Sequence, residues 1–158
     1  MITMLFAVLT ITAHAQLTDW RNISSNNFVM KIIHDQNFLY VGTSGGGIVK
    51  IDKQSGQQTV LKRADGSMTG NSITDMALHD GELWVGTEYN GLTKVTTDGD
   101  IEKFDMKNAG FQSNQHFSGF YFNTDGTMLI GGIAYLYAFD GKKCTSEYYI
   151  NPLSPYSY

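Results

Sequence analysis

Short apolar runs alternate with glycine-containing turns through the middle of the chain. In the clearest stretch four runs are predicted to be strands, at residues 71–78, 82–87, 92–95 and 101–104; the second is rich in residues that favour strands, and apolar and polar residues alternate in the third. A period of two indicates strands with one buried face. Three pairs that favour tight turns separate the runs: Asp80-Gly81, Asn90-Gly91 and Asp98-Gly99. The pattern predicts a four-stranded antiparallel meander.

The same pattern occurs three times at a fixed distance. The run at 39–43 recurs at 83–87 and, in weaker form, at 128–132, so that Gly42, Gly86 and Gly131 lie 44 and then 45 residues apart. A period of this length is typical of propeller blades. The chain is therefore predicted to be all-β, with about three four-stranded antiparallel blades.

The repeat also predicts how the chain is divided. We expect a signal peptide at 1–15, an orphan outer strand at 16–26, blade 1 at 27–70, blade 2 at 71–113, blade 3 at 114–150 and the start of a connection to a further blade at 151–158. Propellers typically close with about four to eight blades. Three blades predict an incomplete, open propeller, which is either a fragment of a longer protein or a unit that closes by assembly.

The N-terminal segment has the composition of a secretory signal. Residues 4–11 are apolar, and Ala13 and Ala15 fit the small-residue rule for cleavage after Ala15, although no Lys or Arg precedes the run. A buried strand is the alternative. The run is shorter than the roughly 20 residues that cross a bilayer. We expect a periplasmic or secreted protein without a stable membrane span after cleavage.

The middle copy carries a family resemblance. Asn71, Ile73, Asp80-Gly81, residues 83–87 and Gly91 resemble the two-component regulator propeller repeat, which builds periplasmic sensor regions of Bacteroidetes hybrid histidine kinases. The resemblance extends over residues 27–150. It implies recognition of an extracytoplasmic ligand, often a glycan fragment. Kinase activity is not carried over, because the sequence shows no kinase or phosphoacceptor region. Similar repeats also occur in secretion-associated and secreted propellers.

The third copy departs most from this repeat. Gly132 replaces the threonine, and Tyr135 stands where a glycine would align.

Composition and charge narrow the functional classes. The chain has 11 Lys and Arg, 15 Asp and Glu, a formal net charge of −4 and no basic block, so nucleic-acid binding is not expected. One cysteine, Cys144, permits no intrachain disulfide and is expected to be a half-buried strand residue. The carboxylates of the middle copy form no recognisable catalytic set, so neither an enzyme nor a cofactor is expected.

The four histidines are His14, His34, His79 and His116. His34 and His79 are offset by one position between copies, and an offset of one reverses the face of a strand. We therefore expect turn and strand-end roles for the histidines and no metal site.

Ligand contacts are expected where the copies differ. Turns between the second and third strands, and connections between blades, gather on one face of a propeller, where loops carry function. The candidate ligand-binding residues on that face are Ser44, Glu88, Tyr89, Asn90, Tyr135 and His116. Tyr and Asn suit stacking on sugars and hydrogen bonding to hydroxyls. In contrast, the equivalent residues Tyr40, Trp84 and Leu129 are expected to fill the packing between blades.

These observations favour a non-catalytic extracytoplasmic module that recognises an oligosaccharide or another small ligand. Two alternatives stay open: a structural or protein-binding propeller of a secretion-associated protein and, least favoured, a propeller lyase or hydrolase. Expected partners also include further blades of a longer parent or a second copy of the chain.

Overall fold

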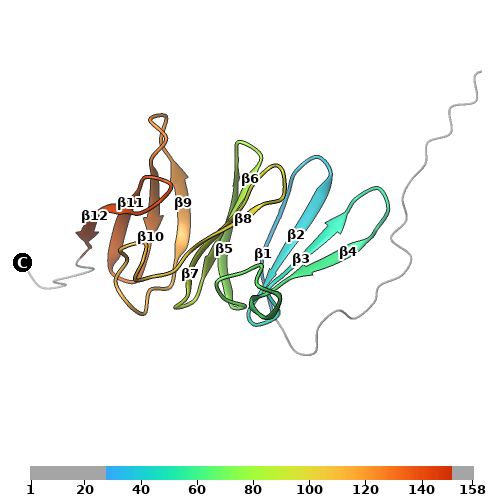
Figure 1. Cartoon of the computed structure of the whole chain (residues 1–158), viewed down its shortest axis with the longest axis horizontal. Helices are drawn as coiled ribbons and strands as arrows, with labels where there is room; N and C mark the ends of the chain where they lie inside the picture. The colour runs from blue at the N-terminus through green and yellow to red at the C-terminus, as the bar shows by residue number, and fades with distance from the viewer. Residues whose placement is uncertain (1–27, 151–158) are drawn as a thin grey trace, which may run out of the picture.

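Three antiparallel sheets make up the described part of the protein. The computed structural model describes residues 28–150. Their twelve strands form sheets in the orders β1-β2-β3-β4, β5-β6-β7-β8 and β12-β11-β10-β9 (Figure 1). The predicted fold class is therefore confirmed. The expected signal peptide, orphan strand and final connection lie outside the described residues.

Each sheet is a meander of four consecutive strands, called a blade below. Blade 1 contains β1 (Val29–His34), β2 (Phe38–Thr43), β3 (Ile48–Asp52) and β4 (Gln58–Leu61). Blade 2 contains β5 (Ile73–His79), β6 (Glu82–Thr87), β7 (Gly91–Val95) and β8 (Ile101–Phe104). Blade 3 contains β9 (Ser118–Phe122), β10 (Met128–Gly131), β11 (Tyr135–Phe139) and β12 (Cys144–Tyr149). A short 3-10 turn, η1 (Arg63–Asp65), lies between blades 1 and 2.

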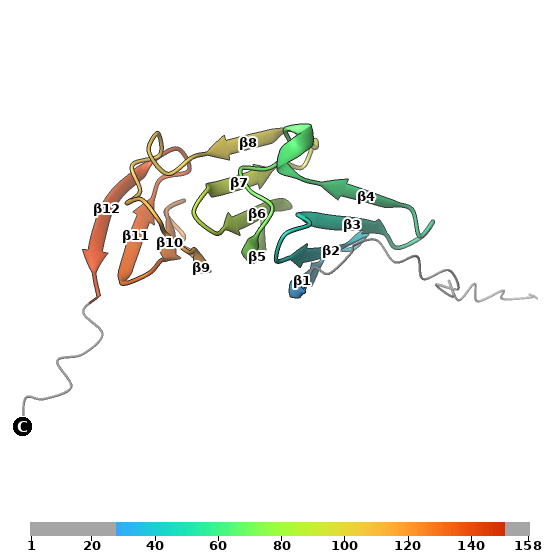
Figure 2. The same cartoon turned by 90° about the horizontal axis from the view of Figure 1, so that it is seen from below.

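The blades stand side by side in an arc. Figure 2 shows β1, β5 and β9 on the inner side of this arc and β4, β8 and β12 on its outer side. This is the radial arrangement of propeller blades. Within residues 28–150 the arc does not close on itself.

Two apolar clusters hold the blades together. The cluster between blades 1 and 2 consists of Tyr40, Ile48, Met68, Ile73, Met76, Leu83 and Val85. The cluster between blades 2 and 3 consists of Trp84, Leu92, Ala109, Phe111, Phe117, Met128, Ile130, Tyr137 and Phe139. Tyr40 and Trp84 are buried in these clusters, as expected from their equivalent positions, whereas Leu129 is half-buried.

The repeated glycine gives the next blade room to approach. A Cβ on Gly42 would lie 2.8 Å from Ile73 Cγ2, and one on Gly86 would lie 3.0 Å from Phe117 Cβ. Both neighbours belong to the following blade, and such contacts are tighter than packed carbon atoms tolerate. The glycine is therefore required by packing between blades.

The repeated threonine closes the turn that follows it. The hydroxyls of Thr43 and Thr87 donate to the carbonyl oxygens of Gly47 and Gly91, at 2.9 and 2.8 Å. In the third copy a Cβ on Gly132 would lie 2.6 Å from Gln115 Oε1. The Gln115 side chain thus takes the space that the threonine occupies in the other blades.

Candidate functional site

One face of the arc is built by turns that interlock with the next blade. The Gly47 amide, in the β2–β3 turn, donates to the Asn71 carbonyl at 2.9 Å. The Tyr89 amide, in the β6–β7 turn, donates to the Gln115 carbonyl at the same distance. Isolated bridges also join Ser44 to Ser72 and Glu88 to His116. The backbone of this face is therefore tied across both blade boundaries.

These contacts bring four of the predicted residues into one row. The row, called the turn face below, contains Ser44, Ser72, Glu88, His116 and Tyr89. The Ser72 hydroxyl donates to Glu88 Oε2 at 3.0 Å, which links the two bridges through side chains. Ser72 was not predicted. Its sequence signal was its place one residue before the first strand of its blade, equivalent to that of His116.

Tyr89 presents an aromatic ring on this row. Its φ of +63° is unusual for a residue other than glycine, and the residue is 53% exposed. The hydrogen bond from the Tyr89 amide to the Gln115 carbonyl helps to hold that conformation. Hydrogen bonding with Glu88 raises the pKa of the Tyr89 phenol. An exposed ring and a carboxylate therefore lie together on a fixed backbone.

Asn90 and Tyr135 are placed differently. Asn90 lies against the connection between blades 1 and 2, since a Cβ on Gly70 would lie 2.6 Å from Asn90 Oδ1. The Tyr135 ring stacks on Tyr137, with ring centroids 5.8 Å apart, and meets Tyr149 edge-on at 5.4 Å. Tyr135 thus belongs to an aromatic group of blade 3.

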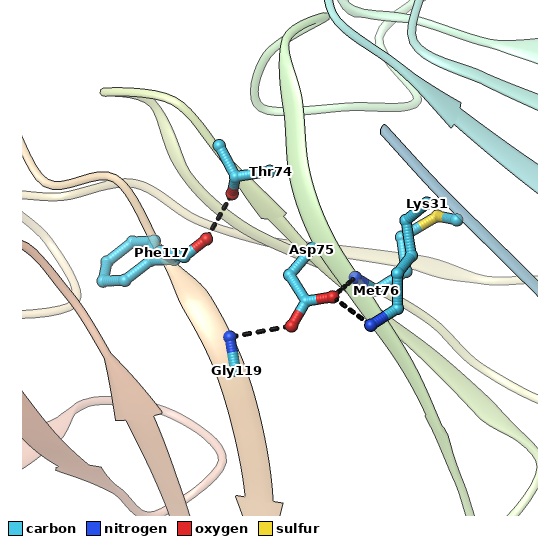
Figure 3. Close-up of polar contacts among 6 residues, drawn as sticks. All are labelled: Lys31, Thr74, Asp75, Met76, Phe117 and Gly119. Carbon is cyan, nitrogen blue, oxygen red and sulfur yellow. Dashed lines mark hydrogen bonds and ion pairs between the residues drawn. The ribbon is translucent and has the colours of Figure 1, made fainter. Parts of the chain in front are cut away.

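A polar network on the inner side of the arc joins all three blades (Figure 3). Asp75 of β5 pairs with Lys31 of β1, with 2.8 Å between Oδ1 and Nζ, and its Oδ2 accepts from the Gly119 amide of β9 at 2.7 Å. The Thr74 hydroxyl donates to the Phe117 carbonyl. The Asp75 side chain is only 13% exposed. Its carboxylate is thus used in joining blades.

Clefts run between neighbouring blades on their outer part. The cleft between blades 1 and 2 has a volume of about 370 Å³; its lining includes Phe38, Tyr40, Lys50, Asp52 and Ile101. The Lys50 ammonium lies 3.8 Å from the centroid of the Phe38 ring, a cation–π distance. The Tyr40 hydroxyl donates to Asp35 Oδ2 at 3.0 Å, and burial together with this bond raises the pKa of Tyr40.

The cleft between blades 2 and 3 is smaller, at about 240 Å³, and repeats this design. Lys94, equivalent to Lys50, lies 5.5 Å from the Trp84 ring centroid and pairs with Glu82 and Glu102 at 3.4 and 3.0 Å. Sequence reasoning missed both clefts. The available signal was the lysine that recurs after 44 residues.

The titratable residues form no evident catalytic centre among those the structure describes. His79 stacks on Phe122, with centroids 4.1 Å apart, and His34 Nδ1 lies 3.2 Å from Lys53 Nζ. Between residues 28 and 150, no three His, Cys, Asp or Glu side chains gather as a metal site would require. Cys144 begins β12 half-buried, as predicted, and burial raises the pKa of its thiol. His14 lies outside the described residues.

Residues 67–89, which include β5 and β6, match the family model described as two component regulator propeller. These residues are similar to a two-component regulator propeller repeat. The resemblance seen in the middle copy is thereby confirmed. No curated protein sequence matches the chain.

Solved structures with similar folds include two extracellular domains from B. thetaiotaomicron, of proteins described as the hybrid two component systems BT4673 and BT3049. For BT4673 the TM-score is 0.62, with 20% identity over 82% of this chain and 18% of that one. For BT3049 it is 0.61, with 20% identity over 89% of this chain and 20% of that one. This propeller-repeat chain thus spans a fifth or less of either matched chain. At this identity the likeness shows the fold. Within the described range, no helix is both long and apolar enough to cross a membrane.

Proposed function

We propose that this propeller-repeat chain is a non-catalytic, extracytoplasmic recognition module whose turn face binds a small ligand, with an oligosaccharide as the ligand class. The observation that carries the proposal is the exposed Tyr89 ring beside the Glu88 carboxylate, on a backbone tied across two blade boundaries. An aromatic face can cover the apolar face of a sugar ring, while a carboxylate accepts from its hydroxyls. Rigid placement lowers the entropy cost of binding.

The remaining predicted residues take two kinds of role in this proposal, ligand contact and support of the site. His116 and Ser44 flank the Glu88–Tyr89 pair along the row and supply further hydrogen-bonding groups. Asn90 and Tyr135 pack against their own neighbours, so we assign them to the support of the site. An extracytoplasmic location is supported by the N-terminal signal pattern and by the extracellular origin of both similar domains. The expected division into signal peptide, orphan strand and blades is retained as part of the proposal.

Binding can be tested by NMR titration of the chain with two probes, a neutral glucan tetrasaccharide and an oligogalacturonide. We expect amide shifts at residues 88–90 and 115–116 with one of them. Tyr89→Ala should weaken that binding by about tenfold or more, while Tyr89→Phe should keep most of it, because the ring is retained. Glu88→Gln should weaken binding, and Glu147→Gln, on exposed β12, is the matched control. Shifts confined to other residues, or equal loss in the control, would contradict this site.

A further inference from the structure

The clefts on the two sides of blade 2 differ in what surrounds an equivalent lysine. In the cleft between blades 2 and 3, the Lys94 ammonium lies 3.4 Å from Glu82 Oε1 and 3.0 Å from Glu102 Oε1. Glu82 begins β6, and Glu102 faces Lys94 across the β7–β8 pair. The ammonium at this repeat position therefore has two carboxylates bound to it.

Blade 1 keeps the lysine and replaces both carboxylates. Phe38 stands 44 positions before Glu82 and begins β2, and Thr59 faces Lys50 across the β3–β4 pair. Both replacements line the cleft between blades 1 and 2. The Lys50 ammonium lies 3.8 Å from the centroid of the Phe38 ring. This cation–π contact helps to hold the ammonium in place, but the ring carries no charge to balance it.

The acidic side chains of this region are committed to other bonds. Asp52 lines the same cleft, and its Oδ1 accepts from two amides and one hydroxyl of its own turn. Asp35 lines an adjoining hollow of about 190 Å³ together with Lys50, and accepts from the Tyr40 hydroxyl and from two nearby amides. Among residues 28–150, no ion pair joins Lys50 to a carboxylate.

The cleft also has the size and the apolar wall of a ligand site. Its volume of about 370 Å³ exceeds the 240 Å³ of the other cleft, and small-molecule sites in proteins typically begin at about 300 Å³. Leu61 of blade 1 and Val95 and Ile101 of blade 2 line it beside the Phe38 ring. Both walls belong to blades that the structure describes.

We propose that this cleft binds a small carboxylate with an apolar body, of the arylalkanoate class. The ligand carboxylate takes beside Lys50 the place that the two glutamates take beside Lys94, and hydrogen bonds between charged groups are among the strong ones. The apolar body lies against Phe38 and Ile101, which removes apolar surface from water. The aromatic contact fixes the ammonium before the ligand arrives, and this lowers the entropy cost of binding.

This site is separate from the turn face. Phe38 begins β2 and Ser44 directly follows its end, so a strand of six residues, about 20 Å long, lies between the two sites. Binding in the cleft therefore goes beyond the proposed function, and either site can fail its test without the other.

The experiment is an NMR titration of the full chain with 3-phenylpropionate up to roughly 10 mM, beside its uncharged analogue 3-phenylpropanamide. We expect amide shifts at residues 38–40, 50–52 and 99–101 with the acid, and binding of the amide weaker by about fivefold or more. Lys50→Met should weaken binding of the acid by a similar factor. Lys94→Met, in the other cleft, is the matched control and should bind as the wild type does. Tyr89→Ala should also leave this binding unchanged, which separates it from the oligosaccharide site.

Two variants of Thr59 form the decisive pair. Thr59 is exposed, so its replacement removes no core contact. Thr59→Glu gives Lys50 the cross-strand carboxylate that Glu102 gives Lys94, so it should block binding of the acid. Thr59→Gln has the same size without the charge and should keep that binding. Well-dispersed spectra verify that each variant is folded.

Four results would overturn the proposal. They are the absence of shifts with the acid, shifts confined to the turn face, equal binding of the acid and the amide, and equal loss of binding in the two Thr59 variants.

Discussion

Asp75 accepts a hydrogen bond from the Gly119 amide at 2.7 Å, and the two residues hold the same position in successive repeats, 44 residues apart. The preceding residue of this series, Lys31, pairs with the same carboxylate (Figure 3). One repeat position thus supplies a cation, an anion and a backbone donor. The three blades are joined because each carries a different residue at this position.

Removing the Asp75 carboxylate should therefore destabilise the blade boundaries. We expect Asp75→Ala to lower the free energy of unfolding by about 2 kcal/mol, because a bond to a charged acceptor is lost and the Gly119 amide is left without it. Asp75→Asn keeps an acceptor oxygen and loses the ion pair with the partly exposed Lys31, so it should lower that free energy by less than about 1 kcal/mol. Urea unfolding measures both changes. Asp98→Asn, in an exposed turn, is the control, and equal effects for all three variants would contradict this role.

The Thr87 hydroxyl should matter more than the Thr87 methyl group. Thr87 is fully buried, and its hydroxyl donates to the Gly91 carbonyl at 2.8 Å. Thr87→Val keeps the shape and removes the donor, so we expect a loss of about 1–3 kcal/mol in unfolding free energy. Thr87→Ser keeps the hydroxyl and should lose about 1 kcal/mol for the buried methyl. Thermal or urea unfolding compares them, and a valine variant as stable as the serine variant would refute the role of this bond.

Tyr137 should make the protein sensitive to alkali. Burial raises the pKa of Tyr137 to about 12, from an ordinary value of 10.0. Above pH 10 the unfolded chain therefore loses this proton while the folded chain keeps it, so stability present at lower pH falls as the pH rises towards 12. Tyr137→Phe should flatten this fall. Part of the fall in stability should remain in this variant, because the pKa of Tyr40 is also raised.

The same substitution should be tolerated at neutral pH. Within the described residues the buried Tyr137 hydroxyl makes no hydrogen bond of normal geometry, and the Gln112 backbone beside it lowers its pKa less than burial raises it, so Tyr137→Phe removes a poorly satisfied polar group. Unfolding free energies measured between pH 7 and 11.5 check both expectations. A large loss at pH 7 would show that the hydroxyl has a partner.

Export should remove the first fifteen residues. Ala13 and Ala15 fit the positions that signal peptidase accepts. On expression in a Gram-negative host we expect a periplasmic product that begins at Gln16, identified by N-terminal mass spectrometry. Ala15→Asp should block cleavage at this bond. Cytoplasmic retention of the unprocessed wild-type chain would rule out the signal peptide.

Several parts of the fold were predictable because they depend on local chemistry. Strand-favouring residues between residues 71 and 104, with alternation at 92–95, identified the strands of blade 2, and Asp80-Gly81 and Asn90-Gly91 identified its first two turns. These signals act within a few residues, so tertiary structure is not needed to see them. The turn-face row was partly predictable because the repeat places equivalent turns on the same face.

The clefts were not predictable in this way. Lys50 and Phe38 lie twelve residues apart on neighbouring strands, and Ile101 of the same cleft comes from the next blade. Which side chains meet there depends on the spacing and tilt of the blades. Likewise, the sequence placed Ser72 inside the predicted strand run 71–78, and only the structure placed its hydroxyl on Glu88.

By itself, the sequence determined the β-strands, the turns, the period of 44 to 45 residues and the resemblance of the middle copy to a known repeat, because strand preference and turn chemistry depend on neighbouring residues. Only the tertiary structure decided that Lys31, Asp75 and Gly119 form one network and that Tyr89 stands exposed beside Glu88. The network joins residues far apart in the chain, and the placement of Tyr89 depends on the hydrogen bond from its amide to Gln115 of the next blade. Both exist only after packing has brought the blades together.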